Sequence, residues 1–253
     1  YSYCKTTITD LMSTSRVIDL VSSSGFALEG YPHRALFSIP FVGLNDEGLP
    51  MIINEKGEVT TTDINFQEIQ NTSFLKYEGP TEPTTTGGLN NMFRYKNWRL
   101  NVFVTYSFGN KLRLDPVFAA GYSDMSAMPK EFKNRWVMPG DEKYTDIPTI
   151  ASVRQYYNDN QLSFAYNAYN YSSARVADGG FIRLKNVSLT YDIPKTFLAK
   201  IGLNTASLKL DATNLLLLYA DDKLNGQDPE FVNSGGVASP LSKQFTFTVR
   251  LGI

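Results

Sequence analysis

The segment QFTFTVRLGI, residues 244–253, decides the fold because its side chains alternate between two chemical classes. Apolar residues occupy every second position, namely Phe245, Phe247, Val249, Leu251 and Ile253. The positions between them carry Gln244, Thr246, Thr248, Arg250 and Gly252. A period of two places successive side chains on opposite faces of a strand. One face of this strand therefore requires an apolar medium, either a protein core or a lipid bilayer, and the other face accepts water.

Length and composition restrict the class of protein without deciding between those two media. The 253 residues suit one large β domain or two smaller domains, and the net charge of −1 gives no basic excess that would indicate nucleic acid or an anionic lipid surface. Cys4 is the only cysteine, so an internal disulfide and a cysteine metal cluster are excluded. No apolar run approaches the roughly 18 residues of a membrane-spanning helix. Because the chain starts at Tyr1 rather than at Met, we expect it to begin after processing or within a longer protein.

The alternation of residues 244–253 recurs in other parts of the chain. Residues 98–108 place Trp98 and every second residue up to Phe108 on one face, over a length close to that of a tilted membrane strand. A tight turn at Lys96 and Asn97 joins this segment to a partner strand, and a change of phase near Lys185 predicts a β-bulge. The predicted strands cover residues 1–11, 33–42, 88–96, 98–109, 180–193, 205–218 and 241–253.

The predicted connections differ in length along the chain. Residues 96–97 and 194–204 form short turns, whereas three long and polar loops are expected at about 43–87, 110–179 and 219–240. If successive strands alternate in direction, the clearest short turns lie together at one end and the long loops at the other. Outer-membrane β-barrels show this asymmetry, with short periplasmic turns and long extracellular loops.

Several motifs in fixed order resemble the C-terminal third of a SusC/RagA-type TonB-dependent outer-membrane transporter. The motifs are FIRLKNVSLTYDIPK at residues 181–195, TNLL at 213–216 and DPE at 228–230, and the resemblance is strongest from Lys76 onward. It implies an all-β fold of about seven antiparallel strands, the C-terminal part of a 22-stranded transmembrane barrel. Because about seven strands cannot close such a barrel, the other strands must come from another polypeptide or from a missing N-terminal portion. The plug domain is expected to be absent from this chain. One departure from the family is Ile253, where an aromatic residue is common.

The resemblance also implies partners and a location. They are the remaining barrel and plug, TonB acting through the plug, a SusD-like lipoprotein that covers the extracellular mouth, outer-membrane lipids, and a cargo of oligosaccharide or peptide. The location is the outer membrane of a Gram-negative bacterium. The polar strand faces are expected to line the lumen, at Arg99, Asn101, Lys209, Asp211 and Arg250. Two alternatives remain open, namely a soluble β-sandwich that binds carbohydrate and a small self-contained outer-membrane barrel.

No residue pattern favours an enzyme, and neither a cofactor nor a metal site is predicted. His33 is the only histidine, and no nucleophile elbow, P-loop or G-x-G-x-x-G motif occurs. Asp141 and Glu142 are adjacent, so on an extended chain their carboxylates point apart. The acidic segment 221–230 lacks the spacing and the terminal glutamate of an EF-hand calcium loop.

The segment RQYYNDNQLSFAYNAYNYSS, residues 154–173, is rich in aromatic residues interleaved with Asn and Gln. Such a mixture can stack on sugar rings, hold a peptide backbone or anchor a protein interface. The alternative is packing of the loop on itself or burial under a partner. The candidate contacts with substrate or lid are Tyr156, Tyr157, Phe164, Tyr166, Tyr169 and Tyr171.

Overall fold

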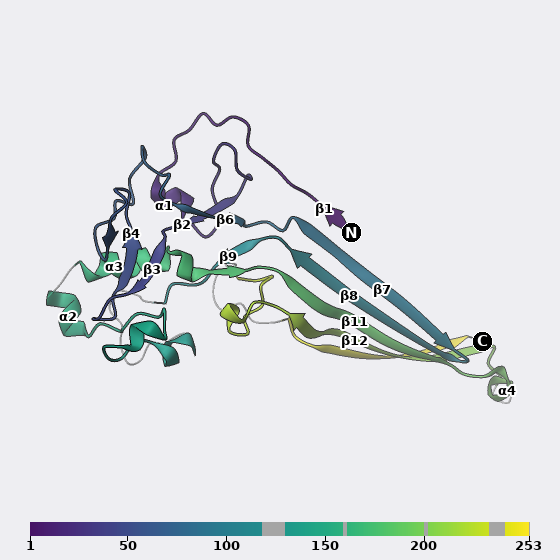
Figure 1. Ribbon diagram of the computed structural model, residues 1–253. Coiled ribbons are helices and arrows are strands. Elements are labelled where there is room, and N and C mark those ends of the chain that lie inside the picture. The colour runs from purple at the N-terminus through teal and green to yellow at the C-terminus, as the bar shows by residue number, and fades with distance from the viewer. Residues whose placement is uncertain (118–129, 159–160, 200–201, 233–240, 253) are drawn as a thin grey trace.

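The computed structural model describes residues 1–117, 130–158, 161–199, 202–232 and 241–252. Its main element is an antiparallel six-stranded sheet in the order β1-β7-β8-β11-β12-β13. The strands of this sheet are β1 (Ser2–Tyr3), β7 (Thr85–Tyr95), β8 (Trp98–Phe108), β11 (Phe181–Asp192), β12 (Thr205–Tyr219) and β13 (Gln244–Gly252). In Figure 1 the long strands β7, β8, β11 and β12 lie side by side, with a lobe of shorter elements at one end. The linear strand order leaves the sheet open among the described residues.

The pairing of the long strands agrees with the period of two in the sequence. Leu100 of β8 lies opposite Phe93 of β7 and Leu189 of β11, and Leu210 of β12 lies opposite Leu189 and Phe247 of β13. Side chains in register share a face, so the apolar positions of five strands form one continuous surface. The strands predicted at 88–96, 98–109, 180–193, 205–218 and 241–253 are therefore confirmed.

The register of β11 is irregular near the lobe, where its pairing with β12 shifts between Ile182 and Arg183. The pairing of β11 with both neighbours shifts between Leu184 and Asn186, which confirms the bulge predicted near Lys185. On β12 the facing irregularity includes Asn214, whose φ of 54° lies in the left-handed region. Asparagine tolerates that conformation better than most residues, so it suits a bulged strand.

The connections of the main sheet separate by length, as the sequence predicted. The β7–β8 turn and the segment carrying α4 (Lys195–Leu198) lie at one end of the sheet, close to the C-terminus (Figure 1). The long connections from β1 to β7, from β8 to β11 and from β12 to β13 lie at the other end, and their described residues build the lobe. None of the helices in the described part of the chain is long and apolar enough to cross a membrane.

The lobe consists of small sheets covered by short helices. The strands are β2 (Ala35–Ser38), β3 (Phe41–Leu44), β4 (Pro50–Ile53), β5 (Val59–Thr60), β6 (Lys76–Pro80), β9 (Lys111–Arg113) and β10 (Val176–Asp178). The α-helices are α1 (Val17–Leu20), α2 (Val153–Asn158) and α3 (Leu162–Asn170), and the 3₁₀ turns are η1 (Lys130–Asn134), η2 (Asp141–Lys143), η3 (Ser173–Arg175) and η4 (Asp222–Leu224). A buried cluster including Val17, Leu20, Phe37, Ile39 and Ile52 joins α1 to β2 and β4. The lobe thus has a hydrophobic core of its own.

Two strand predictions need correction. Residues 33–42 were expected to form a strand of the barrel, but β2 pairs with β6 and β3 pairs with β4, both in the lobe. All four residues of β2 are buried, so this strand needs cover on both faces and could not face lipid on one. At residues 1–11 only Ser2 and Tyr3 form a strand, paired with Thr86 and Thr85 of β7.

Both alternative architectures are wrong. In a β-sandwich a second sheet would cover the apolar face, yet the side chains of Phe93, Leu210 and Phe247 on that face are about 60% exposed. A small self-contained barrel requires a closed sheet, whereas the main sheet is open at β1 and β13 within the described residues. The architecture is instead an open part of a larger barrel wall.

Candidate functional site

The polar face of the main sheet carries all five residues that were predicted to line a lumen. In the pairing register, one row across β8, β11 and β12 consists of Arg99, Thr190 and Lys209. Another row across the same strands consists of Asn101, Ser188 and Asp211. Arg250 lies opposite Ser207, two positions further along the same face. The five side chains therefore share one face, although they come from three strands.

Ion pairs and amide contacts link this polar face. An Arg99 Nη donates to the carboxylate of Asp192 at 2.6 Å, and the Lys209 Nζ lies 3.4 Å from the carboxylate of Asp211. Asn186 Nδ2 also donates to Asp211, at 2.9 Å. Arg99 Nε and Asn101 Oδ1 are buried without a hydrogen-bond partner among the described residues. Because buried polar groups are normally paired, these two atoms indicate that further polar groups lie against this face.

The opposite face of the sheet is apolar and exposed. On β8 it runs from Trp98 to Phe108, which spans about 34 Å along the strand at about 3.4 Å per residue. With the strand tilt of about 40° found in outer-membrane barrels, this corresponds to a height of about 26 Å. The hydrocarbon-facing band of such barrels is about 25 Å tall, with aromatic residues at both borders. Trp98 packs on Tyr191 at one border, with ring centroids 4.6 Å apart, and Phe108 lies near Tyr219 at the other, at 6.2 Å.

The six predicted contact aromatics fall into three groups. Tyr157 and Phe164 are exposed, at 84% and 48%, on α2 and α3 of the lobe. The side chain of Tyr156 lies outside the described part of the structure. Tyr166, Tyr169 and Tyr171 pack inside the lobe instead, and the first two are only 2% exposed.

The packing of Tyr166 and Tyr169 explains why they do not reach the surface. The Tyr166 hydroxyl donates to the Thr149 carbonyl at 2.8 Å and accepts from the Ala151 N–H at 3.2 Å. The ring of Tyr169 lies under the Arg175 guanidinium, 5.8 Å from its centroid. Burial raises the pKa of both phenols to about 12. As candidate contacts with substrate or lid these two residues are corrected to core residues of the lobe.

Three buried arginines were not predicted from the sequence. Arg113 donates to the carbonyls of Phe37, Asn170 and Ser172, and burial lowers its pKa to about 10. Arg175 bonds the carboxylate of Glu131 at 2.7 Å. These arginines cross-link segments that are distant in sequence, and no residue period encodes their burial.

The third arginine, Arg183, binds the DPE motif to the sheet. It bonds the fully buried Asp228 at 2.6 Å and lies 3.2 Å from Glu230. Asp228 is therefore engaged in an ion pair, and Asp221 accepts from the backbone N–H groups of Lys223 and Asp178. Within the described ranges no group of three or more His, Cys, Asp or Glu residues is placed to hold a metal ion.

An open wall of long antiparallel strands, polar on one face and apolar over about the thickness of a bilayer on the other, defines the chain as part of a transmembrane β-barrel. No protein-family model matches the sequence. TonB-dependent receptor P3 of Formosa agariphila is 31% identical over 178 residues, covering 70% of this chain and 15% of that protein. TonB-dependent receptor P39 of the same organism is 28% identical over 158 residues, covering 61% and 14%.

Solved structures give the same fold. The RagAB peptide transporter matches with a TM-score of 0.63 and 22% identity, covering 91% of this chain and 24% of that chain. The RagAB peptide importer in the open-open state matches with a TM-score of 0.59 and 21% identity, covering 87% and 22%. The chain is a segment of a SusC/RagA-like TonB-dependent transporter. It spans about 15% of the length of the curated relatives that it matches.

Proposed function

We propose that this chain is part of the wall of a TonB-dependent outer-membrane importer of large nutrients. The observation that carries the proposal is the two-faced sheet, whose apolar face is bordered by aromatic residues about one hydrocarbon thickness apart. In this assignment the apolar face contacts lipid. The polar face with Arg99, Asn101, Lys209, Asp211 and Arg250 lines the lumen around a plug, through which TonB supplies the energy for import.

The lobe is assigned to the extracellular mouth. It lies at the end of the sheet where the connections are long, which in outer-membrane barrels is the extracellular end (Figure 1). The loops at 43–87, 110–179 and 219–240 contribute to it, and the proposed partner at this mouth is a SusD-like lipoprotein lid. The RagAB transporter, which shares the fold, is named for peptides, and oligosaccharide is the second cargo class considered for this chain.

The experiment uses the full-length protein that contains this segment, produced in a Gram-negative host. Uptake of peptide and of oligosaccharide mixtures is measured in cells with TonB and in cells without it, and the protein is located by membrane fractionation. The expected result is outer-membrane location and uptake that requires both this protein and TonB. Uptake that is unchanged by deletion of TonB, or location of the protein outside the outer membrane, would contradict the proposal.

A further inference from the structure

A groove lies on the polar face of the main sheet where the sheet meets the lobe. Its volume is about 660 Å³, within the range of roughly 300 to 1,000 Å³ that is typical of ligand sites. Strands β7, β8 and β11 form its floor, and its walls come from Asn110, from Gly179 and from the segment Pro229–Val232. Its polar side chains include Lys185, Asn110 and Glu230.

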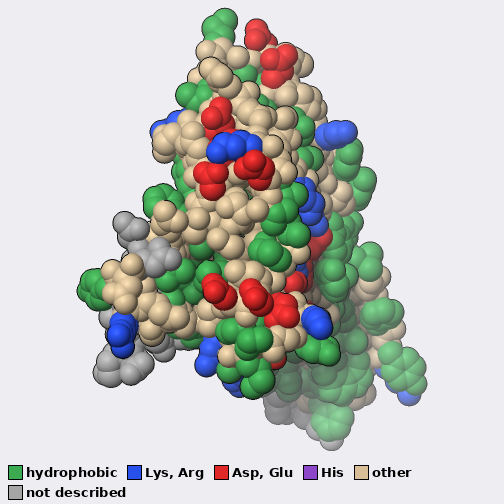
Figure 2. All heavy atoms as spheres, turned by 60° about the vertical axis from the view of Figure 1, so that its left-hand side comes forward, with side chains coloured by type: hydrophobic (Ala, Val, Ile, Leu, Met, Phe, Trp, Pro, Cys, Tyr) green, Lys and Arg blue, Asp and Glu red, His purple; other side chains and the backbone are tan. Residues whose placement is uncertain are grey.

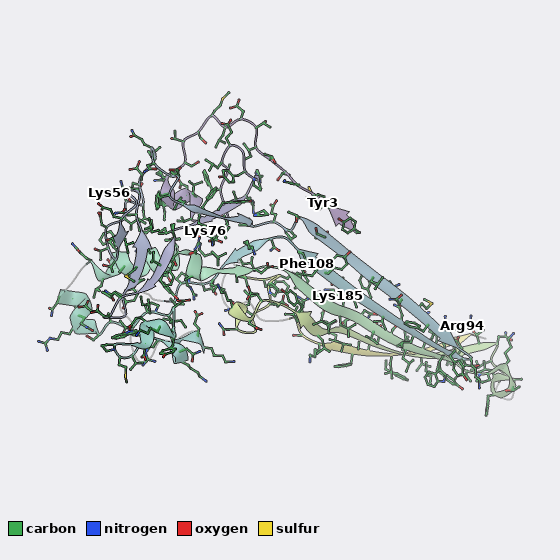
Figure 3. All side chains as sticks on the ribbon, in the orientation of Figure 1. Tyr3, Lys56, Lys76, Arg94, Phe108 and Lys185 are labelled. Atoms are coloured by element: carbon green, nitrogen blue, oxygen red, sulfur yellow. The ribbon has the colours of Figure 1, made fainter. Side chains whose placement is uncertain are left out.

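Lys185 brings a positive charge into this groove. The register shift between Leu184 and Asn186 leaves Lys185 outside the strand pairing, which lets the side chain of a bulged residue depart from strict alternation. Figure 3 labels Lys185 on β11 toward the lobe end of the sheet, far from Arg94 at the other end. The side chain is half-buried, and it forms no ion pair within the described residues. A partly desolvated ammonium group with no counter-charge attracts an anion.

Asn110 places an unsatisfied amide on the same groove. The residue is 6% exposed, and its Oδ1 has no hydrogen-bond partner in the part of the chain that the structure describes. The backbone around it is fixed, because the Gly179 N–H donates to the Asn110 carbonyl at 3.0 Å. A buried amide oxygen without a partner is costly unless another molecule supplies an N–H or O–H donor to it.

The carboxylates near the groove already have a cation. Arg183 bonds Asp228 at 2.6 Å and also lies 3.2 Å from Glu230, so both carboxylates have this arginine as their ion-pair contact. Lys185 is not within ion-pair distance of either carboxylate. The groove thus offers a lysine without an ion-pair partner and an amide oxygen without a hydrogen-bond donor, within the described residues.

We propose that this groove binds a carboxylate-bearing part of the cargo, with the Lys185 ammonium as the ion-pair partner of the carboxylate and with an N–H or hydroxyl group of the same cargo donating to the Asn110 Oδ1. The inference rests on the proposed import function and adds the chemistry that the wall recognises. The carboxylate can belong to a peptide or to an acidic sugar. Acidic residues outnumber basic ones over the segments 1–84 and 110–180 taken together, and Figure 2 shows acidic side chains spread over this end of the molecule. That field repels polyanions, so a cargo with few carboxylates fits best.

The test is a binding measurement on the purified full-length transporter in detergent. The probes are an alanine oligopeptide with a free carboxyl end, the same peptide with an amidated end, an otherwise neutral oligosaccharide that carries one uronic acid residue, and the methyl ester of that oligosaccharide. The variants are Lys185→Gln, Lys185→Arg and Asn110→Leu. The control is Lys243→Gln, an exposed lysine that does not line the groove.

We expect the unmodified protein to bind at least one acid about tenfold more tightly than its neutral derivative. The pair that shows this preference identifies the source of the carboxylate. Lys185→Gln should abolish the preference, Lys185→Arg should keep most of it, Asn110→Leu should weaken binding of the acid, and Lys243→Gln should have no effect.

Equal binding of acid and neutral probes, absence of binding by both acids, or a preference that survives Lys185→Gln would overturn the inference. If Lys185→Gln fails to fold, the comparison of acid with neutral probe on the unmodified protein still decides the question. Uptake that depends on TonB without any preference for the acid would overturn this inference alone. Uptake independent of TonB would instead remove the proposed function.

Discussion

At the scale of single residues, the lobe depends on aromatic side chains that are buried with their hydroxyl groups. Tyr166 is held by two hydrogen bonds to the segment before α2, and Tyr169 packs against Arg175. A helical period connects these positions, because Leu162, Ala165, Tyr166 and Tyr169 follow the spacing of one buried helix face. The same spacing places Tyr166 and Tyr169 on the buried face of α3 and leaves Phe164 off that face, where it is exposed.

Alkaline pH should destabilise the lobe through these two phenols. Their pKa of about 12 in the folded state lies above the value of about 10 in an unfolded chain. A raised pKa contributes stability that is complete below pH 10 and is lost as the pH rises from about 10 to about 12. Each phenol contributes about 2 to 3 kcal/mol by this linkage. Tyrosinate absorbance should therefore rise together with loss of the lobe's helical signal, and Tyr166→Phe should move that loss toward higher pH.

The control for the alkaline experiment is the exposed Tyr157. Tyr157→Phe removes one titrating phenol from the surface and should leave the pH of lobe unfolding unchanged. If the lobe keeps its helical signal while every tyrosine ionises, the stability of the lobe does not depend on the protonation of the buried phenols of Tyr166 and Tyr169.

At the scale of elements, each long strand presents two faces with different requirements. Val102 lies close to midway between Trp98 and Phe108 on the apolar face of β8, whereas Thr105 lies on the polar face of the same strand. Val102→Arg in the full-length transporter should cost about 2 to 4 kcal/mol of folding free energy in the membrane, because it places a charge near the bilayer midplane. Thr105→Arg should cost much less. Urea unfolding in vesicles measures both, and equal costs would show that the apolar face does not contact lipid.

A second element-scale prediction concerns the attachment of the segment 221–232 to β11. Asp228 is fully buried with Arg183, and removal of one partner from such a pair leaves an uncompensated buried charge. Asp228→Ala should therefore destabilise the protein by about 3 to 5 kcal/mol. Glu230→Ala is the matched control, because Glu230 contacts the same arginine but its side chain is 43% exposed, and its loss should cost about 1 kcal/mol or less. Thermal unfolding measures the loss of stability in both variants. Similar losses would show that the burial of Asp228 does not make its ion pair with Arg183 more important for stability than the exposed contact of Glu230.

At the scale of the whole molecule, the sequence predicted the wall better than the lobe. Alternation identified the five long strands and the bulge at Lys185, because a surface between lipid and water imposes a period of two. Residues 33–42 were misplaced because β2 is buried on both faces, and a short apolar run does not reveal its partners. The pairing of Arg183 with Asp228 and the open amide of Asn110 depend on contacts between distant segments, which one sequence does not encode locally.

The last prediction concerns the outer end of the lobe. Figure 1 places α2 at the end of the lobe that is farthest from the short turns of the sheet. Tyr157 on α2 and Phe164 on α3 are both exposed, although large aromatic side chains usually find cover in a completed assembly. We therefore expect Tyr157→Ala combined with Phe164→Ala to weaken association with the proposed SusD-like lid in the full-length transporter. An anchor aromatic commonly contributes about 2 kcal/mol or more to an interface, which corresponds to a loss of about 30-fold in affinity.

Co-purification of the lid and uptake of the nutrient would be measured separately for this double variant. The barrel should assemble normally, because both side chains lie outside the long strands of the main sheet and outside the buried face of α3. Met12→Ala, which changes a fully exposed side chain on the segment after β1, serves as the control and should alter neither measurement. Loss of uptake with the lid still bound would assign the two aromatics to cargo rather than to the lid. If lid binding and uptake both stay at the level of the unmodified protein, neither contact exists, and the functional surface of the lobe must lie elsewhere.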